Sequence, residues 1–323
     1  MRSISDAFLW QGSTLCDNSL EDYVVHAAAQ RLERNRTDLL VGDWSATHFT
    51  CVCCPLVFRM LNPEAKIILM LRDPIQRALS RFLEQKSLAW APLHQQVKNH
   101  TFATYVHQEM NTIDMCLARA VRYRGRQGGS NSPRPMLRGG AAVAVGVPGA
   151  ESAAAAGWGA GMGLATWMEA QCYERSNILG WSVYDIFLEN YMAHFPLNQI
   201  LVLYTEELAA DPLGMLRRVE GHLGLRPAAY NATLLATVFN SRGCYAWNCA
   251  RQANEVRSAA ELALAPDSPA GAQQSQQWQQ SPFGRAVSRL IGFYRPHLQQ
   301  LVRWGEQGVI APLPPSWRTA YGV

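Results

Sequence analysis

The stretch KIILMLRDPIQRALSRF, residues 66–82, constrains the fold of this chain more than any other. The apolar run KIILML predicts a strand that is buried on both faces. After it, Ile75, Leu79 and Phe82 recur at helical spacing and predict a helix with one buried stripe. Asp73-Pro74 is typical of a helix start, because the aspartate caps the first turn and the proline occupies the first helical position. A strand that runs directly into such a helix indicates a parallel sheet.

The rest of the chain repeats this order. QILVLYTEEL predicts a second buried strand, and Asp211-Pro212 then begins another helix. Earlier, LLVGDWSATHF predicts a short strand that ends at Gly42, and CPLVFRMLNP predicts a short helix with Leu56, Met60 and Leu61 facing inward. Further helices are expected over residues 20–35, 102–123, 176–196 and 283–304. Strands that alternate with helices predict an α/β fold with a parallel sheet.

Length and composition favour one domain. The chain has 323 residues and is 48% hydrophobic, which is enough to bury a full core, so residues 1–323 are predicted to form a single domain. Residues 127–166 are rich in Gly, Ala, Ser and Pro without any period, and we interpret them as a disordered insertion. Residues 265–281 form a second loose tract.

Charge and hydropathy exclude several classes. The net charge is +4, but the basic residues form no long runs, so a nucleic-acid partner is not indicated. No apolar run is long enough to span a bilayer, and the first residues lack a signal-peptide core, so the sequence shows no route into the secretory pathway. Sequons at Asn35, Asn99 and Asn231 nevertheless permit a secretory location and predict glycosylation there.

The cysteines leave two interpretations open. There are eight of them, and they do not form the paired C-x-x-C halves of a zinc ribbon, so no metal site is expected. Disulfides and plain buried thiols both remain possible from the spacing alone. The cysteines lie at Cys16, Cys51, Cys53, Cys54, Cys116, Cys172, Cys244 and Cys249.

The strand–helix junction predicts an anion site. Arg72 ends the strand, and Arg77, Ser80 and Arg81 follow on one side of the helix. A helix start also points free backbone N–H groups and the positive end of its dipole at this place. Arginine suits a phosphate because its planar fork donates two parallel bonds. The alternative is an ordinary solvated helix face.

The segment RDPIQRALS, from Arg72 to Ser80, fits the pattern R-[DN]-P-x-x-R-x-x-S. In this the chain resembles the Golgi carbohydrate sulfotransferases of the heparan and chondroitin type, which use the sulfate donor PAPS (3′-phosphoadenosine 5′-phosphosulfate). The resemblance implies a P-loop-type parallel sheet flanked by helices. It also implies that Arg72 and Ser80 bind the 3′-phosphate of the donor, that no metal is required, and that the acceptor is a hydroxyl of a glycan or proteoglycan.

Other segments extend the resemblance. LLVGDWSAT is similar to the segment that carries the catalytic glutamate of that family, which implies that Asp43 is the general base. Alternatively, Asp43 is a turn residue after Gly42, and His48 is a reserve base. FPLNQILVLYTEEL, FNSRGCY and FYRPHLQQL resemble later parts of the family domain. The usual loop over the adenosine is not recognisable, and Arg242 and Gly243 are its predicted substitutes in cofactor binding.

One departure concerns the donor loop. The family holds the 5′-phosphosulfate with a K-x-G-T-T loop, but no lysine precedes Lys66 in this chain. We therefore expect that the first strand and its phosphosulfate loop are missing, that the gene product is truncated at its N-terminus, and that residues 1–323 alone do not transfer sulfate. The rival hypothesis is an inactive fragment or pseudoenzyme that binds a glycan or a protein. A P-loop kinase is not indicated, because G-x-x-x-x-G-K-[ST] is absent.

The resemblance also has implications for compartment and cross-links. It implies a lumenal Golgi enzyme that is a type II membrane protein when complete. It further implies a disulfide between Cys116 and Cys172, at the ends of the insertion, and another between Cys244 and Cys249. The pairing of the remaining four cysteines stays open.

Overall fold

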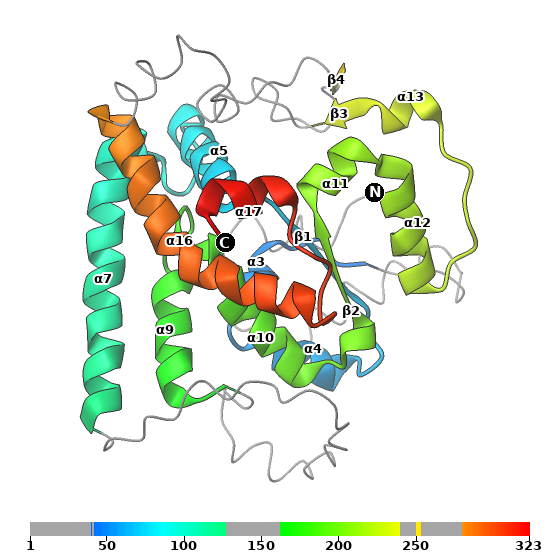
Figure 1. Cartoon of the computed structure of the whole chain (residues 1–323), viewed down its shortest axis with the longest axis horizontal. Coiled ribbons are helices and arrows are strands. Elements are labelled where there is room, and N and C mark those ends of the chain that lie inside the picture. Colours follow the sequence, from blue (N-terminus) through cyan, green and yellow to red (C-terminus); the bar gives the residue numbers. More distant parts are fainter. Residues whose placement is uncertain (1–39, 41, 127–161, 240–249, 253–279) are drawn as a thin grey trace. The chain divides into compact units, whose positions relative to one another are not determined.

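The structure is a computed structural model, shown in Figure 1. It describes residues 40, 42–126, 162–239, 250–252 and 280–323. By its internal contacts the chain divides into two compact units, each built from separate stretches of sequence. Unit 1 consists of Met1–Pro63, Glu109–Trp181 and Ile186–Phe195, and unit 2 consists of Glu64–Gln108, Ser182–Asp185 and Pro196–Val323. The prediction of a single domain stays a prediction.

The described elements are α3 (Thr47–Thr50), α4 (Cys54–Leu61), β1 (Ile67–Leu71), α5 (Pro74–Ser87), α6 (His94–Val97), α7 (Phe102–Arg126), α9 (Leu164–Glu174), η2 (Gly180–Ser182), α10 (Tyr184–His194), η3 (Leu197–Gln199), β2 (Ile200–Tyr204), α11 (Thr205–Ala210), α12 (Pro212–Leu223), α13 (Ala232–Leu235), β3 (Thr237–Phe239), β4 (Ala250–Gln252), α16 (Pro282–Glu306) and α17 (Pro315–Tyr321). They form an α/β arrangement in which helices predominate.

The two strands predicted to be buried pair with each other in unit 2. β1 and β2 run parallel and side by side, with Ile67 opposite Ile200 and Leu71 opposite Tyr204 (Figure 1). Within the part of the chain that the structure describes, they form a two-stranded sheet. The prediction that the strand KIILML, now β1, is buried on both faces is wrong, because Ile68 and Met70 on one face are exposed. β2 buries its last three residues.

The helix starts of unit 2 follow the sequence signals. Asp73 caps α5 by accepting a bond from the Gln76 N–H at 2.8 Å, and Asp211 caps α12 in the same way through Gly214 at 2.8 Å. In both helices a proline opens the first turn. Helix α16 begins at Pro282, close to the predicted start. The short helix α17 was not predicted, because its buried residues amount to one turn of pattern.

Helix α17 nevertheless secures the ends of both strands. Its Trp317 and Tyr321 are almost fully buried. The Trp317 indole donates to Glu206, just after β2, at 2.7 Å, and the Tyr321 hydroxyl accepts a bond from the Ile75 N–H, just after β1, at 3.2 Å. The carboxyl ends of the two strands are therefore held by a segment more than a hundred residues further along the chain.

Unit 1 is built from helices and cross-links. A disulfide between Cys116 on α7 and Cys172 on α9 joins these two helices. A second disulfide, Cys51–Cys54, closes the turn before α4. Asn190 on α10 donates to the Val52 carbonyl at 2.7 Å, so this turn is also fixed to a helix that is buried almost all round.

Several local predictions were wrong or fall outside the described residues. The short strand expected to end at Gly42 falls largely outside the described residues, because residues 39 and 41 are not described. α4 buries Cys54, Pro55 and Val57, whereas Met60 and Leu61, which were predicted to face inward, are exposed. The buried side of α4 is the side that carries the disulfide, which the apolar spacing did not reveal. Helix α9 begins at Leu164, inside the range predicted as an insertion. Three predicted segments lie outside the described residues: residues 127–161 of the insertion, residues 265–279 of the second loose tract, and the helix expected at 20–35.

Candidate functional site

Arg72 lies at the carboxyl end of β1. Its backbone carbonyl accepts a hydrogen bond from the Tyr184 hydroxyl at 2.6 Å, which fixes the chain at the junction. The side chain is half-buried, and among the described residues its guanidinium forms no hydrogen bond or ion pair. Ligands of open parallel sheets bind at the carboxyl ends of the strands. A half-buried guanidinium in this position is available to an anion.

Ser80 is the second group of the predicted pair. It is half-buried on α5, two turns after the junction, and its hydroxyl forms no hydrogen bond within the described parts of the chain. Arg81 differs, because it pairs with Glu84 at 2.8 Å. Arg72 and Ser80 are thus the two groups of the predicted motif that no described residue occupies.

Arg77 adds a half-buried charge between them in sequence. Its guanidinium donates to the Ser182 hydroxyl at 3.3 Å. Burial lowers the pKa of Arg77, and the charges of Arg81 and Arg72 add to this, while Tyr184 counteracts it. Arginine stays protonated despite such a shift. Three positive side chains therefore influence one another around the start of α5.

The expected free backbone N–H groups are not present at this helix start, and that part of the prediction was wrong. Pro74 has no N–H, Ile75 donates to Tyr321, and Gln76 donates to the Asp73 carboxylate. The first turn is therefore satisfied internally. Any anion at this junction must rely on side chains.

Asp73, the capping residue, is itself unusual. Its pKa is raised to about 6, mainly by burial and to a smaller extent by the Glu206 charge, although hydrogen bonds from Gln76 and Tyr321 lower it. Only 5% of the residue is exposed. The carboxyl group of Asp73 therefore loses its proton near pH 6.

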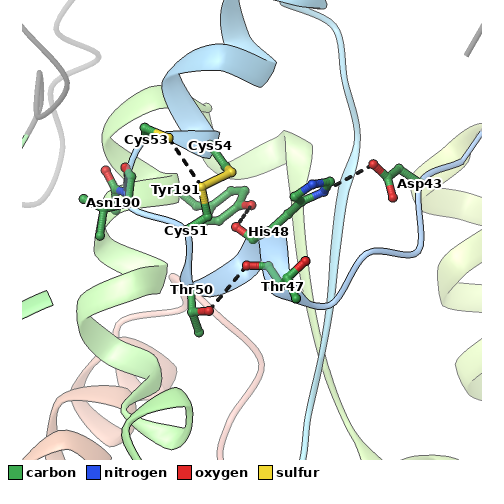
Figure 2. Close-up of a disulfide and its surroundings, with 10 residues drawn as sticks. Asp43, Thr47, His48, Thr50, Cys51, Cys53, Cys54, Asn190 and Tyr191 are labelled. Atoms are coloured by element: carbon green, nitrogen blue, oxygen red, sulfur yellow. Dashed lines mark hydrogen bonds and ion pairs between the residues drawn. A yellow bond between two sulfur atoms is a disulfide. The ribbon is translucent and has the colours of Figure 1, made fainter. Parts of the chain in front are cut away.

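Asp43, the predicted base, lies in unit 1 on the turn that precedes α3 (Figure 2). One carboxylate oxygen accepts the Ser45 N–H at 2.8 Å, and the other lies 3.2 Å from Nδ1 of His48. The Tyr191 hydroxyl on α10 donates to the His48 carbonyl at 2.9 Å. Asp43 therefore contacts His48, and His48 in turn is hydrogen-bonded to the buried helix α10, so the turn is linked to that helix through two contacts.

These partners change the acidity of Asp43. Burial raises its pKa, but the hydrogen bond and charge of His48, together with the hydrogen bonds of Ser45, outweigh burial and lower the pKa to about 2. A carboxylate with this pKa is a weaker base than an ordinary one.

His48 does not serve as an accessible reserve base. The residue is 5% exposed, and its ring packs edge-on against Phe58 with ring centres 5.1 Å apart. Its Nε2 atom is buried. His48 therefore positions Asp43 and is not open to a substrate in this structure.

Some of the remaining predicted residues are described by the structure, and the others lie outside the described ranges. Asn99 and Asn231 are exposed, as a glycosylated asparagine must be. Cys116 and Cys172 form the disulfide that the resemblance implied. The others lie outside the described residues: Asn35, Arg242, Gly243, Cys244 and Cys249.

One cysteine group has the compactness of a metal site. The sulfur atoms of Cys51, Cys53 and Cys54 lie within 4.8 Å of one another, and no other such group of metal-ligating residues occurs in the described ranges. However, the Cys51–Cys54 disulfide uses two of these sulfurs, and only thiolates bind metals well. The C-x-x-C spacing at 51–54 is the signal that could have revealed this disulfide.

A cleft of about 190 Å³ lies in unit 1, beside the Cys116–Cys172 disulfide. Arg119 and Arg175 contribute to its wall. None of the predicted donor-binding or catalytic residues lines it. No helix in the described parts of the chain has the length and apolarity required to cross a bilayer.

No protein-family profile matches the chain. It is 48% identical over 44 residues to heparan sulfate glucosamine 3-O-sulfotransferases 3B1 and 3A1 of Mus musculus, a match that covers 14% of this chain. It is 26% identical over 118 residues, 36% of its length, to the membrane-associated sulfotransferase kil1 of Dictyostelium discoideum. The chain spans 11% of the length of each mouse enzyme and 24% of kil1. The chain is therefore locally similar to sulfotransferases.

Proposed function

We propose that this protein is a sulfotransferase that moves a sulfuryl group from PAPS to a hydroxyl of a glycan. The observation that carries the proposal is the pair Arg72 and Ser80, two half-buried polar side chains that the described protein leaves without partners at the carboxyl end of a parallel strand. The local similarity to sulfotransferases supports the reaction class. A P-loop-type sheet is part of the same proposal.

Arg72 and Ser80 bind the 3′-phosphate of the donor in this proposal. The guanidinium of Arg72 donates two parallel charge-assisted bonds, and the hydroxyl of Ser80 donates a third. Half-buried Arg77 adds positive potential at the start of α5 without having to contact the ligand. Arg242 and Gly243 complete the nucleotide contacts as proposed residues. In this proposal the Ser80 hydroxyl donates to a phosphate oxygen from the half-buried position that it has in the structure.

Asp43 receives the proton of the acceptor hydroxyl. The acceptor oxygen forms a bond to sulfur, the bond from sulfur to the phosphate oxygen breaks, and adenosine 3′,5′-bisphosphate leaves with the bonding electrons. Because the pKa of Asp43 is about 2, it takes the proton only as the hydroxyl becomes acidic during attack. His48 and Ser45 keep the carboxylate in one orientation.

We propose an oxidising compartment, the Golgi lumen, with a glycan or proteoglycan as acceptor and with attachment to the membrane. The two disulfides, Cys51–Cys54 and Cys116–Cys172, support this, because such bonds persist in oxidising compartments. One of the similar proteins is described as membrane-associated.

A second candidate is a nucleotide-binding chain that does not transfer sulfate. It is favoured by the absence of lysine from residues 1–65, since the resemblance assigns the 5′-phosphosulfate to a lysine-bearing loop. The two candidates share the 3′-phosphate site and differ in the reaction.

Radiolabelled PAPS separates them. Purified chain is incubated with it and with heparan sulfate, and label on the protein and on the glycan is measured. Label on both supports transfer, and label retained by the protein alone supports the second candidate. Arg72→Ala should abolish retention, whereas Arg303→Ala, an exposed arginine on α16 whose guanidinium donates to Gln300, should not. Wild-type protein that neither retains label nor transfers it to the glycan would contradict both candidates.

A further inference from the structure

The cleft beside the Cys116–Cys172 disulfide has no role in the proposed function. It is lined by one side of α7 and by the end of α9, two helices of unit 1 that run side by side (Figure 1). Its volume is about 190 Å³. Pockets for drug-sized ligands usually measure about 300–1,000 Å³, so this cleft has room for a molecule of roughly one ring.

Two arginines from different elements line the cleft. Arg119 lies on α7, and Arg175 directly follows α9. Neither guanidinium forms a hydrogen bond or an ion pair with any residue that the structure describes. Other arginines, such as Arg217 and Arg218, pair with glutamates. Two like charges in the wall of one small cleft favour an anion as ligand, because it is attracted to both.

Ser176 gives independent evidence for a ligand. The residue lines the cleft, is 3% exposed, and its hydroxyl has no hydrogen-bond partner in the described protein. Its backbone is fixed, because its N–H donates to the Tyr173 carbonyl at 3.0 Å and its carbonyl accepts the Trp181 N–H at 3.1 Å. Buried hydroxyls nearly always have a partner, and lacking one costs free energy. A ligand oxygen in the cleft would supply it.

Glu109 determines what else the ligand must carry. It is half-buried in the same wall and forms no ion pair with the arginines of the cleft within the described ranges. Two positive charges and one negative charge leave a formal charge of +1. This favours a singly charged anion over a phosphate ester, which carries about −1.5 to −2 at pH 7. A carboxylate only accepts hydrogen bonds, so the ligand needs a donor such as a hydroxyl.

The remaining wall is apolar. Ile113 and Met115 contribute to it together with the disulfide between Cys116 and Cys172. Such a surface packs against C–H groups and not against charge. A compact ring with polar substituents on its rim therefore fits both parts of the cleft.

We propose that this cleft binds a ring-sized, hydroxylated molecule with one singly charged oxyanion. The oxyanion accepts bonds from Arg119, Arg175 and Ser176, and a hydroxyl of the ligand donates to Glu109. Carboxylates and sulfate esters share this chemistry. The inference is independent of the proposed function, because none of the residues assigned to the donor or the base lines the cleft.

Calorimetry on the full chain tests the ligand chemistry with four probes. Glucuronate and glucose 6-sulfate each carry one oxyanion and several hydroxyls, and binding of either supports the site. The tighter of the two identifies the oxyanion. Glucose lacks the charge and cyclohexanecarboxylate lacks the hydroxyls, so both should bind at least tenfold more weakly.

Variants test the residues. Arg119→Ala and Arg175→Ala should each weaken binding of the preferred probe roughly tenfold or more, and Ser176→Ala should weaken it severalfold. The matched control is Arg122→Ala, because Arg122 is exposed on the same helix but does not line the cleft. It should bind as the wild type does. Thermal unfolding at the wild-type temperature shows that each variant is folded.

The outcomes that would overturn the site are specific. They are no binding of either acidic probe by the wild type, equal binding of glucose or cyclohexanecarboxylate, unchanged affinity in both cleft-arginine variants, or an equal loss in Arg122→Ala. Adenosine 3′,5′-bisphosphate is titrated separately. Its failure to bind would overturn the proposed function and leave this site standing.

Discussion

Two aspartates of this protein, Asp43 and Asp73, lie at comparable places in their units, but their pKa values are shifted in opposite directions. Each precedes a helix, and each accepts a backbone N–H within three residues at 2.8 Å. Yet the pKa of Asp43 is lowered to about 2, and the pKa of Asp73 is raised to about 6. The residue type and the local motif are alike, so the cause lies in what surrounds each carboxyl group.

The surroundings differ in charge. Asp43 has His48 beside it, and this partner outweighs the cost of burial. Asp73 is more deeply buried, faces the like charge of Glu206, and has neutral hydrogen-bond donors as partners. Hydrogen bonds from neutral groups therefore do not compensate for the burial of Asp73, whereas the hydrogen bond and charge interaction with His48 do so for Asp43.

The same contrast has a functional side. The turn at Asp43 is saturated with protein partners, which makes the carboxylate well oriented. The junction after β1 leaves Arg72 and Ser80 without described partners, which makes them available to a ligand. One region is built to position a group, and the other is built to receive one.

The largest expected effect on stability is that of Asp73→Asn. Because the native state binds the Asp73 proton more tightly than the unfolded state, the wild type loses stability as pH rises from about 4 to about 6. Asparagine keeps the cap and removes the buried charge, so urea unfolding at pH 7 should show a gain of up to roughly 3 kcal/mol. The gain should vanish near pH 4.

Asp211→Asn is the control for that measurement. Asp211 caps α12 before a proline as Asp73 caps α5, but it is exposed. It should change the urea midpoint very little at either pH. If Asp73→Asn also left the midpoint unchanged at pH 7, the raised pKa assigned to Asp73 would be wrong.

Asp43→Asn should have the opposite sign. A lowered native pKa contributes stability that is complete above about pH 4 and is lost as pH falls toward 2. Asparagine keeps the bond from Ser45 but loses the charge beside His48, so the variant should lose about 2 kcal/mol at pH 7. Thermal unfolding at pH 7 and pH 3 measures it, and a loss that is no smaller at pH 3 would contradict the assignment.

Tyr321→Phe should have the smallest effect, and it sharpens the account of Asp73. It removes the hydroxyl that the Ile75 N–H reaches at 3.2 Å and that also hydrogen-bonds to Asp73. The expected cost is about 1 kcal/mol. The pKa of Asp73 should rise further, because a bond that favours the charged form is lost. NMR titration of the carboxyl group would show whether it does.

The sequence predicted the parts of the fold that local patterns encode. The two buried strands, the caps at Asp73 and Asp211, and the long helix α7 follow from apolar spacing and turn chemistry over a few residues. The exposed face of β1 was not predictable from its composition, because an uninterrupted apolar run does not tell which neighbours cover it.

The candidate site was predicted only in part, for a similar reason. Arg72 and Ser80 carry a recognisable spacing, and Asp43 lies in a segment with a resemblance to a catalytic one. The sequence could not show that Tyr321 accepts the Ile75 N–H or that His48 changes the acidity of Asp43, since both depend on contacts between residues far apart or folded together in space.

The central claim is that Arg72 binds a 3′-phosphate, and one calorimetric comparison tests it directly. The wild type should bind adenosine 3′,5′-bisphosphate more tightly than adenosine 5′-monophosphate by roughly 2 to 3 kcal/mol, the contribution of a charge-assisted contact. In Arg72→Ala that difference should largely disappear, while Arg303→Ala should retain it. A wild type that binds the two nucleotides equally, or an Arg72→Ala variant that still distinguishes them fully, would contradict the account.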